Sequence, residues 1–298
     1  MSVSTQREAA IKRNPHPDFR KVEASRPDWD GESRFRFTKT AEPGWSFGDG
    51  ANGQRGADAD GRKHVCIDPY EEGRPLTSNY KLLISGIVPR PIGFVSSQAE
   101  DGTARNLAPF SYFNMVNHDP PLFALGVAAT LAAPKDTLRN ILASRECVVS
   151  IIGEDFVEAA NATSVDAPPS ASEWDISGLT PVFDTVDVKA PRVKEAVFSV
   201  ECKLESVREF ESRAIPGKKT GCLVILEGTR FWVREDAINE ERDLIDPAVL
   251  KPVSRLGGIT YGRVTEAVEI PRPRFKEDVG GEEGYNKLKE KAGKGKSA

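Results

Sequence analysis

Between residues 92 and 269 the chain is divided into short apolar segments separated by turn-forming residues, and this division constrains the fold most. The segments at 92–97, 104–115, 122–127, 146–152, 196–208, 219–233 and 258–269 are predicted strands. The sequence Glu-Asp-Gly-Thr at 100–103 is a hairpin turn signal between the first two. Only 134–142 and 154–161 in this region predict helices. Many short strands with few helices indicate a mainly β fold, an antiparallel sheet closed into a barrel.

The predicted helix at 134–142 carries a candidate anion site. Asp136 or Thr137 is the expected N-cap, and Leu138, Ile141 and Leu142 form the apolar face. Lys135 and Thr137 therefore stand at a helix N-terminus, where free N–H groups and the helix dipole favour negative charge.

The sequence divides into three parts. Residues 1–75 form a loop-rich N-terminal extension, 76–270 the barrel domain and 271–298 a tail that we expect to be disordered. Gly48, Gly50 and Gly53 match GxGxxG, but no strand precedes them and no helix follows, which argues against a Rossmann site. Aromatic residues in the extension indicate that parts of it dock elsewhere; they are Trp29, Phe35, Phe37, Trp45 and Phe47.

Charge and composition exclude several classes of partner. The net charge of −4 gives no electrostatic reason to expect nucleic acid. No apolar run approaches the ~20 residues of a membrane span, and the N-terminus has no secretory signal, so we expect a cytoplasmic protein without a membrane partner. The four cysteines contain no CxxC pair and are expected to be reduced thiols, three of them in apolar strand-like runs. The three histidines lie far apart, which argues against a zinc site.

Polar side chains gather on the predicted hairpin at 92–115. The hydroxyl and amide groups outnumber what a core-facing strand surface needs, and they are Ser96, Ser97, Asn106, Ser111 and Asn114. Together with Lys135 and Thr137 they suit a flat polar heterocycle with a phosphate tail. The spacing alone does not identify the ligand.

Each of these residues also has a purely structural interpretation. Asn106 and Asn114 are equally able to satisfy backbone groups at strand ends. Arg90, fixed between two prolines, is a candidate structural arginine, and Lys135 a candidate solvated residue. The aromatic residues at 110, 112 and 113 are better candidates for barrel core than for a stacking platform.

Several motifs together resemble a known family. They are PRPIGFVSS at 89–97, DGTARNLAPFSYFN at 101–114, DPP at 119–121 and KDTLRNI at 135–141. With shorter matches at 161–164, 173–174, 178–180 and 191–193, the chain is similar to the flavin-reductase-like, FMN-binding split-barrel family over roughly residues 76–265. The resemblance implies a six-stranded Greek-key-type split barrel with a few peripheral helices, a homodimer, and FMN near the subunit interface.

The same resemblance implies cofactor contacts along the hairpin. Ser96 and Ser97 are expected to contact the flavin or its phosphate. Asn106, with the backbone of Leu107 and Ala108, is expected to meet the edge of the isoalloxazine ring.

Further contacts are implied beyond these residues. The ribityl and phosphate end is assigned to Ser111, Phe113 and Asn114, and the neutralisation of phosphate to Lys135 and Thr137. Arg90 is another candidate for the flavin or phosphate. Arg255 and Tyr261 belong to a late segment expected to close over the flavin.

The resemblance implies an FMN-dependent oxidoreductase. NADH or NADPH is the expected transient hydride donor, and the acceptor is free flavin, another small molecule or a partner oxygenase. A non-catalytic flavin-binding module with a protein partner is the alternative, and a pyridoxamine-phosphate-oxidase-like activity fits the motifs less closely. Three features depart from the family pattern: Ser97 replaces a common threonine, Phe231 and Trp232 stand where some relatives carry histidine, and the N-terminal arm has no counterpart in the minimal domain.

Overall fold

The computed structural model describes residues 14–32, 34–51, 63–168 and 171–295. They form two units, the first from Met1–Arg34 and Pro69–Val264, the second from Phe35–Asp68 and Thr265–Ala298. The N-terminal extension is therefore shared between the two units. The boundaries fall near 34, 69 and 264, whereas the sequence analysis placed them at 75 and 270.

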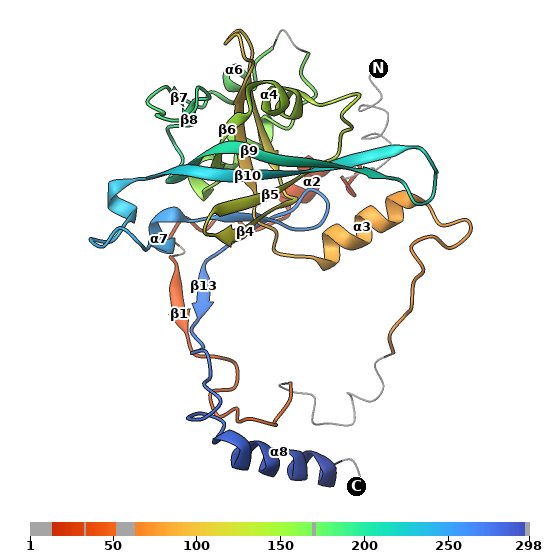
Figure 1. Cartoon of the computed structure of the whole chain (residues 1–298), viewed down its shortest axis with the longest axis vertical. Helices are drawn as coiled ribbons and strands as arrows, with labels where there is room; N and C mark the ends of the chain where they lie inside the picture. Colours follow the sequence, from red (N-terminus) through yellow and green to blue (C-terminus); the bar gives the residue numbers. More distant parts are fainter. Residues whose placement is uncertain (1–13, 33, 52–62, 169–170, 296–298) are drawn as a thin grey trace. The chain divides into compact units, whose positions relative to one another are not determined.

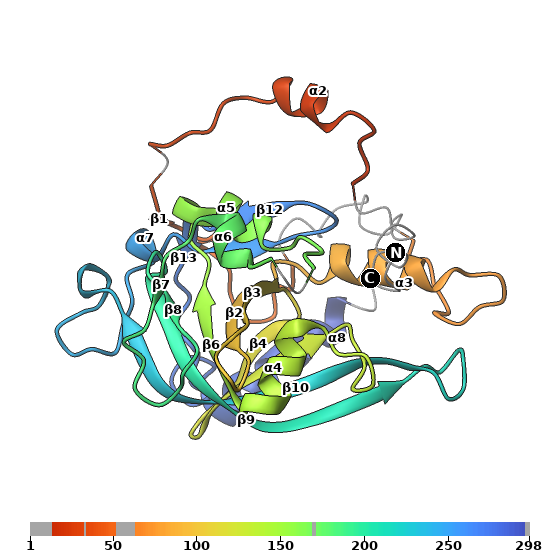
Figure 2. The same ribbon diagram turned by 90° about the horizontal axis from the view of Figure 1, so that it is seen from above.

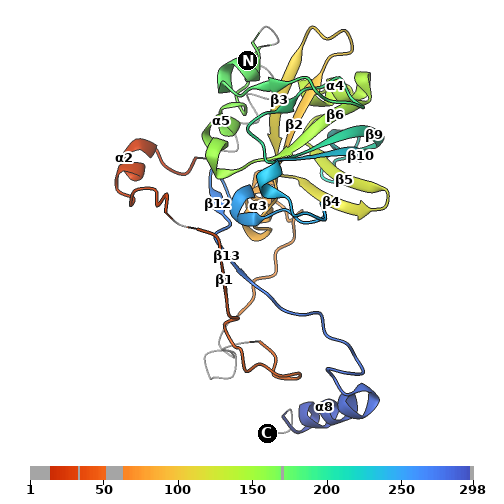
Figure 3. The same cartoon turned by 90° about the vertical axis from the view of Figure 1, so that its left-hand side faces the viewer.

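A seven-stranded antiparallel sheet forms the first unit (Figures 1 and 3). β3 and β4 are its two edge strands, and only Ser111 and Tyr112 separate them along the chain. Because the chain links the two edges directly, the sheet curls into a barrel that is split between β3 and β4. The prediction of a mainly β split barrel is confirmed, with seven strands in the sheet in place of six. In sheet order the strands are β3 (Arg105–Phe110), β2 (Gly93–Gln98), β6 (Glu146–Ile151), β9 (Phe198–Glu211), β10 (Lys219–Val233), β5 (Pro121–Val127) and β4 (Phe113–His118).

The corner between β3 and β4 depends on two glycines. The segment 104–115 was predicted as one strand, but it breaks at Ser111 and Tyr112. A Cβ atom on Gly93 would lie 2.8 Å from the ring of Phe113, and one on Gly126 would lie 2.8 Å from Cβ of Tyr112. Only glycine therefore allows the corner to approach β2 and β5 this closely.

Helix α4 (Asp136–Ser144) packs on β2, β3 and β6 (Figure 2). Leu138 and Ile141 are completely buried, as the apolar face predicts. The N-cap is Lys135, and it makes no side-chain capping hydrogen bond. The expectation that Asp136 or Thr137 caps the helix is wrong, because both residues already have helical geometry in its first turn.

The remaining helices of the first unit are short or lie at its periphery. α3 (Leu76–Gly86) was not predicted, and the predicted helix at 154–161 consists of a 3-10 turn, η1 (Glu154–Phe156), followed by α5 (Val157–Ala162). The others are α2 (Phe19–Ala24), α6 (Glu173–Ser177), η2 (Glu235–Ala237) and α7 (Pro247–Leu250). No helix within the described ranges is long and apolar enough to cross a membrane.

Two apolar cores lie on opposite faces of β2. Val95 belongs to the barrel interior with Leu138, whereas Phe94 packs in a second core with Leu107 and Trp174 of α6. This alternation follows from the two-residue period of a strand. Three cysteines are buried free thiols, as predicted, at positions 147, 202 and 222, and Cys66 is an exposed one.

The late part of the chain differs most from prediction. The expected strand at 258–269 is replaced by β11 (Val253–Arg255) and β12 (Tyr261–Arg263), which form an antiparallel pair, and by β13 (Glu266–Val268). β13 lies in the second unit, paired in parallel with β1 (Arg36–Thr38). Helix α8 (Gly281–Gly295) occupies most of the tail that we expected to be disordered. Two further short strands, β7 (Pro181–Val182) and β8 (Arg192–Val193), pair in the first unit.

Candidate cofactor site

Four polar side chains are buried where α4 packs on β2 and β3. Ser97 and Asn106 face each other across the antiparallel pair, and Thr137 and Asn140 lie one turn apart on the same face of α4. Asn106 Nδ2 donates to Thr137 Oγ1 over 2.7 Å, and Asn140 Nδ2 donates to Ser97 Oγ over 3.2 Å. We call these four residues the amide–hydroxyl cluster. Because its polar groups bond to one another, the cluster holds the first turns of α4 against the strands.

Lys135 lies directly before this cluster and is exposed. Its backbone is extended, and no side chain caps the start of α4. The only acidic residue of the first turn, Asp136, is paired with Arg139. An ammonium group beside uncapped helical N–H groups is a favourable site for an anion.

The corner after β3 presents a second polar region. Ala108, Ser111 and Phe113 are half-buried, and Asn114 is exposed with its Oδ1 accepting the N–H of Met115 over 3.0 Å. Asn106 and Phe110 are four residues apart on β3, which places their Cα atoms roughly 13 Å apart, and Ser111 follows Phe110 at the corner. A single phosphate group therefore cannot contact both the start of α4 and the corner, although the family resemblance assigned phosphate contacts to both.

The opposite face of β2 and β3 contains buried polar atoms of its own. Ser96 and Leu107 are fully enclosed. Ser96 Oγ and Trp174 Nε1 have no hydrogen-bond partner among the described residues. Glu173 lies directly before Trp174 in α6, and burial raises the pKa of its carboxyl group above the ordinary value. Ser96 thus points away from the amide–hydroxyl cluster and towards the second core.

Arg90 is engaged by the backbone. Its guanidinium donates to the carbonyl oxygens of Ile84, of Ile87 over 2.8 Å and of Leu256 over 2.8 Å, and its own backbone pairs with Arg255. Burial lowers the pKa of Arg90. These contacts match the structural interpretation, in which Arg90 joins the end of α3 to the loop after β11.

Arg255 and Tyr261 organise that loop. Arg255 donates to the carbonyl of Gly258 over 2.9 Å, and its guanidinium lies 4.3 Å from the ring centroid of Tyr261. The hydroxyl of Tyr261 donates to Asn161 Oδ1 over 2.9 Å, and burial raises the pKa of Tyr261. Both residues therefore lie apart from the start of α4.

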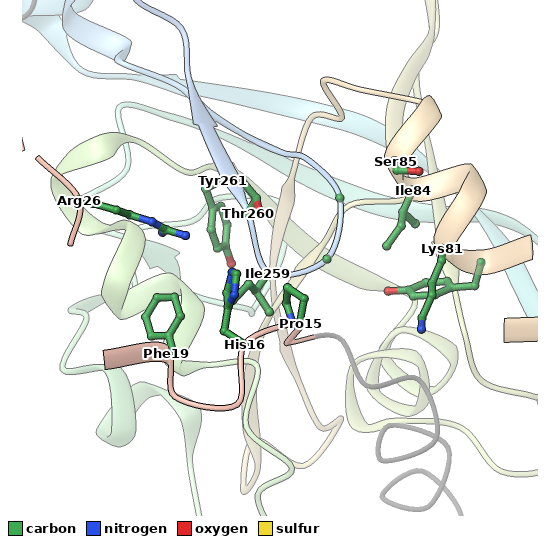
Figure 4. Close-up of a pocket in the computed structure, with 13 residues that line it drawn as sticks. Pro15, His16, Phe19, Arg26, Lys81, Ile84, Ser85, Ile259, Thr260 and Tyr261 are labelled. Carbon is green, nitrogen blue, oxygen red and sulfur yellow. The ribbon is translucent and has the colours of Figure 1, made fainter. Parts of the chain in front are cut away.

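A pocket of about 580 Å³ opens beside this loop (Figure 4). Its walls come from three segments: the N-terminal arm at 15–26, α3 at 80–85, and the loop at 257–261. Sequence reasoning did not find it, because its walls come from segments without any shared pattern.

Asn140 is the other residue that sequence reasoning missed. Its position could have indicated its burial. Asn140 lies three residues after Thr137, on the face of the predicted helix that also carries Leu138 and Ile141. Within the described residues no group of histidine, cysteine or acidic side chains is arranged to hold a metal ion.

The sheet order and the split between β3 and β4 place the chain among split-barrel proteins. The model of the flavin reductase like domain matches residues 85–251, so the chain belongs to the flavin reductase like family. The predicted resemblance is thereby confirmed, and family membership supports a flavin cofactor.

Three comparisons illustrate the relationship. An uncharacterized protein of Halalkalibacterium halodurans is 36% identical over 201 residues, which are 67% of this chain and 93% of that protein. The crystal structure of nitrilotriacetate monooxygenase component B from Bacillus cereus is similar with a TM-score of 0.65 and 36% identity, covering 70% of this chain and 100% of that one. The 2-nitrobenzoate 2-nitroreductase of Pseudomonas fluorescens gives a TM-score of 0.60 and 30% identity, covering 72% and 98%.

Proposed function

We propose that the protein is an FMN-dependent oxidoreductase that accepts hydride from NADH or NADPH and reduces free flavin or another small acceptor. The observation that carries this proposal is the exposed Lys135 at the uncapped start of α4, next to the amide–hydroxyl cluster, in a chain of the flavin reductase like family. FMN, when bound, supplies the hydride and electron transfer, and the protein supplies position and electrostatics.

The donor groups fit the two ends of such a cofactor. The ammonium group of Lys135 and the N–H groups of the first turn of α4 suit the phosphate. The neutral groups of Ser111 and Asn114 suit the ribityl chain or the ring, with the backbone of Leu107 and Ala108 between the two ends. In the sheet β3 pairs with β2 alone, and its outer edge is the side that we propose for the flat heterocycle.

Thr137 and Asn106 act indirectly in this arrangement. Both are almost completely buried and bonded to each other, so they position the start of α4. Arg90 acts as a structural residue because its Nη1 and Nη2 groups donate to backbone carbonyl groups.

The first test is the visible spectrum of the purified protein and the affinity of Lys135→Ala for FMN. We expect a yellow protein with one FMN per chain. Loss of a charge-assisted phosphate contact costs about 1.5–3 kcal/mol, which is roughly a ten- to hundredfold loss in affinity. Lys218→Ala, an exposed lysine between β9 and β10, is the matched control. A protein that neither contains nor binds FMN contradicts the proposal.

The second test separates an enzyme from a flavin-binding module. Anaerobic mixing with NADH or NADPH should bleach the flavin absorbance, and the re-oxidation rate with free FMN and with a nitroaromatic compound then defines the acceptor. A flavin that stays oxidised with excess of both nucleotides leaves the binding module as the better interpretation. The Bacillus cereus relative is named as a component of a monooxygenase, so a partner oxygenase is a further acceptor to assay.

We also propose a homodimer. Met115 and Val116 lie on the edge strand β4 and are 64% and 57% exposed. Leu82 and Leu83 of α3 are exposed as well. Apolar surface of this kind is typical of an interface between subunits. Light scattering should give twice the chain mass of 32.6 kDa, and a monomer that retains FMN would contradict this part.

A further inference from the structure

We propose that the pocket between the N-terminal arm, α3 and the loop at 257–261 binds a small organic anion with a flat apolar body. This anion would be the acceptor of the enzyme. That role rests on the proposed function, whereas the binding of the anion to the pocket does not.

The charged side chains of the pocket favour an anion. Arg26 and Lys81 line it together with His16, and the lining contains no aspartate or glutamate within the described residues. Neither Arg26 nor Lys81 forms an ion pair with another described residue. In Figure 4 these two side chains lie on different sides of the pocket. An anionic ligand would therefore meet uncompensated positive charge wherever its acidic group lies.

The walls between these charges are apolar and aromatic. Phe19 comes from the arm, Ile84 from α3, and Ile259 and Tyr261 from the loop (Figure 4). Tyr261 is fixed by its hydrogen bond to Asn161. A pocket of about 580 Å³ with mostly apolar walls and a few polar groups has the size and composition of small-molecule sites.

The arm is held in place by specific contacts with β12. The guanidinium of Arg263 lies 4.1 Å from the ring centroid of Trp29 and donates to the carbonyl of Asp30 over 3.2 Å. The same guanidinium pairs with Glu154 over 2.9 Å. Arg263 thus ties the arm to β12 at residues 29–30, directly after the segment that lines the pocket.

The pocket also lies next to the proposed cofactor region. Ile84, one of its walls, accepts a hydrogen bond from Arg90, and Arg90 lies three residues before Gly93, which packs against the ring of Phe113. The pocket therefore lies on the side of the barrel where β2 begins and β3 ends, and this end of β3 is remote from Lys135. An acceptor bound there would be near Ser111 and Asn114, the groups that we propose for the ribityl chain or the ring.

The experiment measures binding of 2-naphthoate and of its neutral analogue 2-naphthamide to the full chain by calorimetry, with and without FMN. We expect saturable binding of naphthoate and roughly tenfold weaker binding of the amide. Arg26→Gln and Lys81→Gln should each weaken naphthoate binding roughly three- to tenfold and leave the affinity for FMN unchanged. Arg20→Gln and Lys21→Gln, which are exposed on α2 outside the lining, are the matched controls.

Two results would overturn the proposal: equal affinity for naphthoate and naphthamide, or pocket variants that bind naphthoate like the controls. Trp29→Ala tests the arm without changing the lining, and it should weaken naphthoate binding while circular dichroism stays unchanged. If charge-dependent naphthoate binding is found in a protein that does not bind FMN, the proposed function fails and the anion site stands. With FMN bound, naphthoate should compete with the acceptor in steady-state reduction, and a lack of competition would remove the pocket from the acceptor path.

Discussion

Loss of the hydrogen bond between Asn106 and Thr137 should lower both the stability of the protein and its affinity for the cofactor. Thr137→Val removes the acceptor at nearly constant volume and leaves the buried Asn106 amide, 8% exposed, without its 2.7 Å partner. Asn106→Leu leaves the Thr137 hydroxyl, 2% exposed, in the same situation. An unsatisfied buried polar group costs about 1–3 kcal/mol, so each single variant should lose that amount of unfolding free energy.

The double variant provides the decisive comparison. Removing both partners leaves no orphaned group, so Asn106→Leu/Thr137→Val should lose less than the sum of the single losses, with a coupling energy of about 0.5–3 kcal/mol. Urea unfolding followed by far-UV circular dichroism measures the three free energies. Single losses that add within about 0.5 kcal/mol would refute the claim that the two groups depend on each other.

Measurement of the affinity for FMN separates an effect on the proposed cofactor site from a general loss of stability. Thr137→Val should also weaken FMN binding, because the start of α4 is less well held. The control is Ser199→Ala, which breaks the 2.8 Å contact with Ser150 in the buried pairing of β6 and β9. It should lower stability with no change in the affinity for FMN.

Three further perturbations test the fold around the site. Gly93→Ala introduces a Cβ 2.8 Å from the ring of Phe113 and should cost about 1–3 kcal/mol, whereas Gly31→Ala, with open space around it, should cost far less by the same urea assay. Leu138→Ala empties a fully buried position of α4 and should cost about 2–5 kcal/mol. Glu173 has a raised pKa, so the folded state holds that proton more tightly than the unfolded state and stability falls as pH rises from the ordinary glutamate range to the raised value. Glu173→Gln should remove this decrease, and an unchanged profile of stability against pH would show that the carboxyl is not desolvated.

The strands were predictable where apolar runs are bounded by turn residues. The segments that became β2, β5, β6, β9 and β10 are of this kind, and local patterns found them. The break at Ser111 and Tyr112 was not predictable from local sequence, because it depends on close approach to Gly93 and Gly126 on other strands. Helix α8 was missed because its composition of glycine, lysine and glutamate indicates a disordered tail.

The site was predictable only in part, for a similar reason. Ser97, Asn106 and Thr137 were selected from the sequence and meet in one cluster, since strand register and helix period bring them together. Arg90 was selected for its place between prolines, but a carbonyl 166 residues away occupies one of its donors. The role of a residue cannot be predicted from local sequence when it depends on contacts with loops far along the chain.

The position of the two sites relative to the family match supports separate roles for them. Asn106, Lys135 and Thr137 all lie inside the family match at 85–251. The pocket residues Phe19, Arg26 and Lys81, and the loop at 257–261, all lie outside it. A part common to the family is suited to a task common to the family, such as holding flavin. Substitutions at the start of α4 should therefore change the affinity for FMN with every acceptor alike, whereas substitutions in the pocket should change the ranking of acceptors at constant FMN affinity.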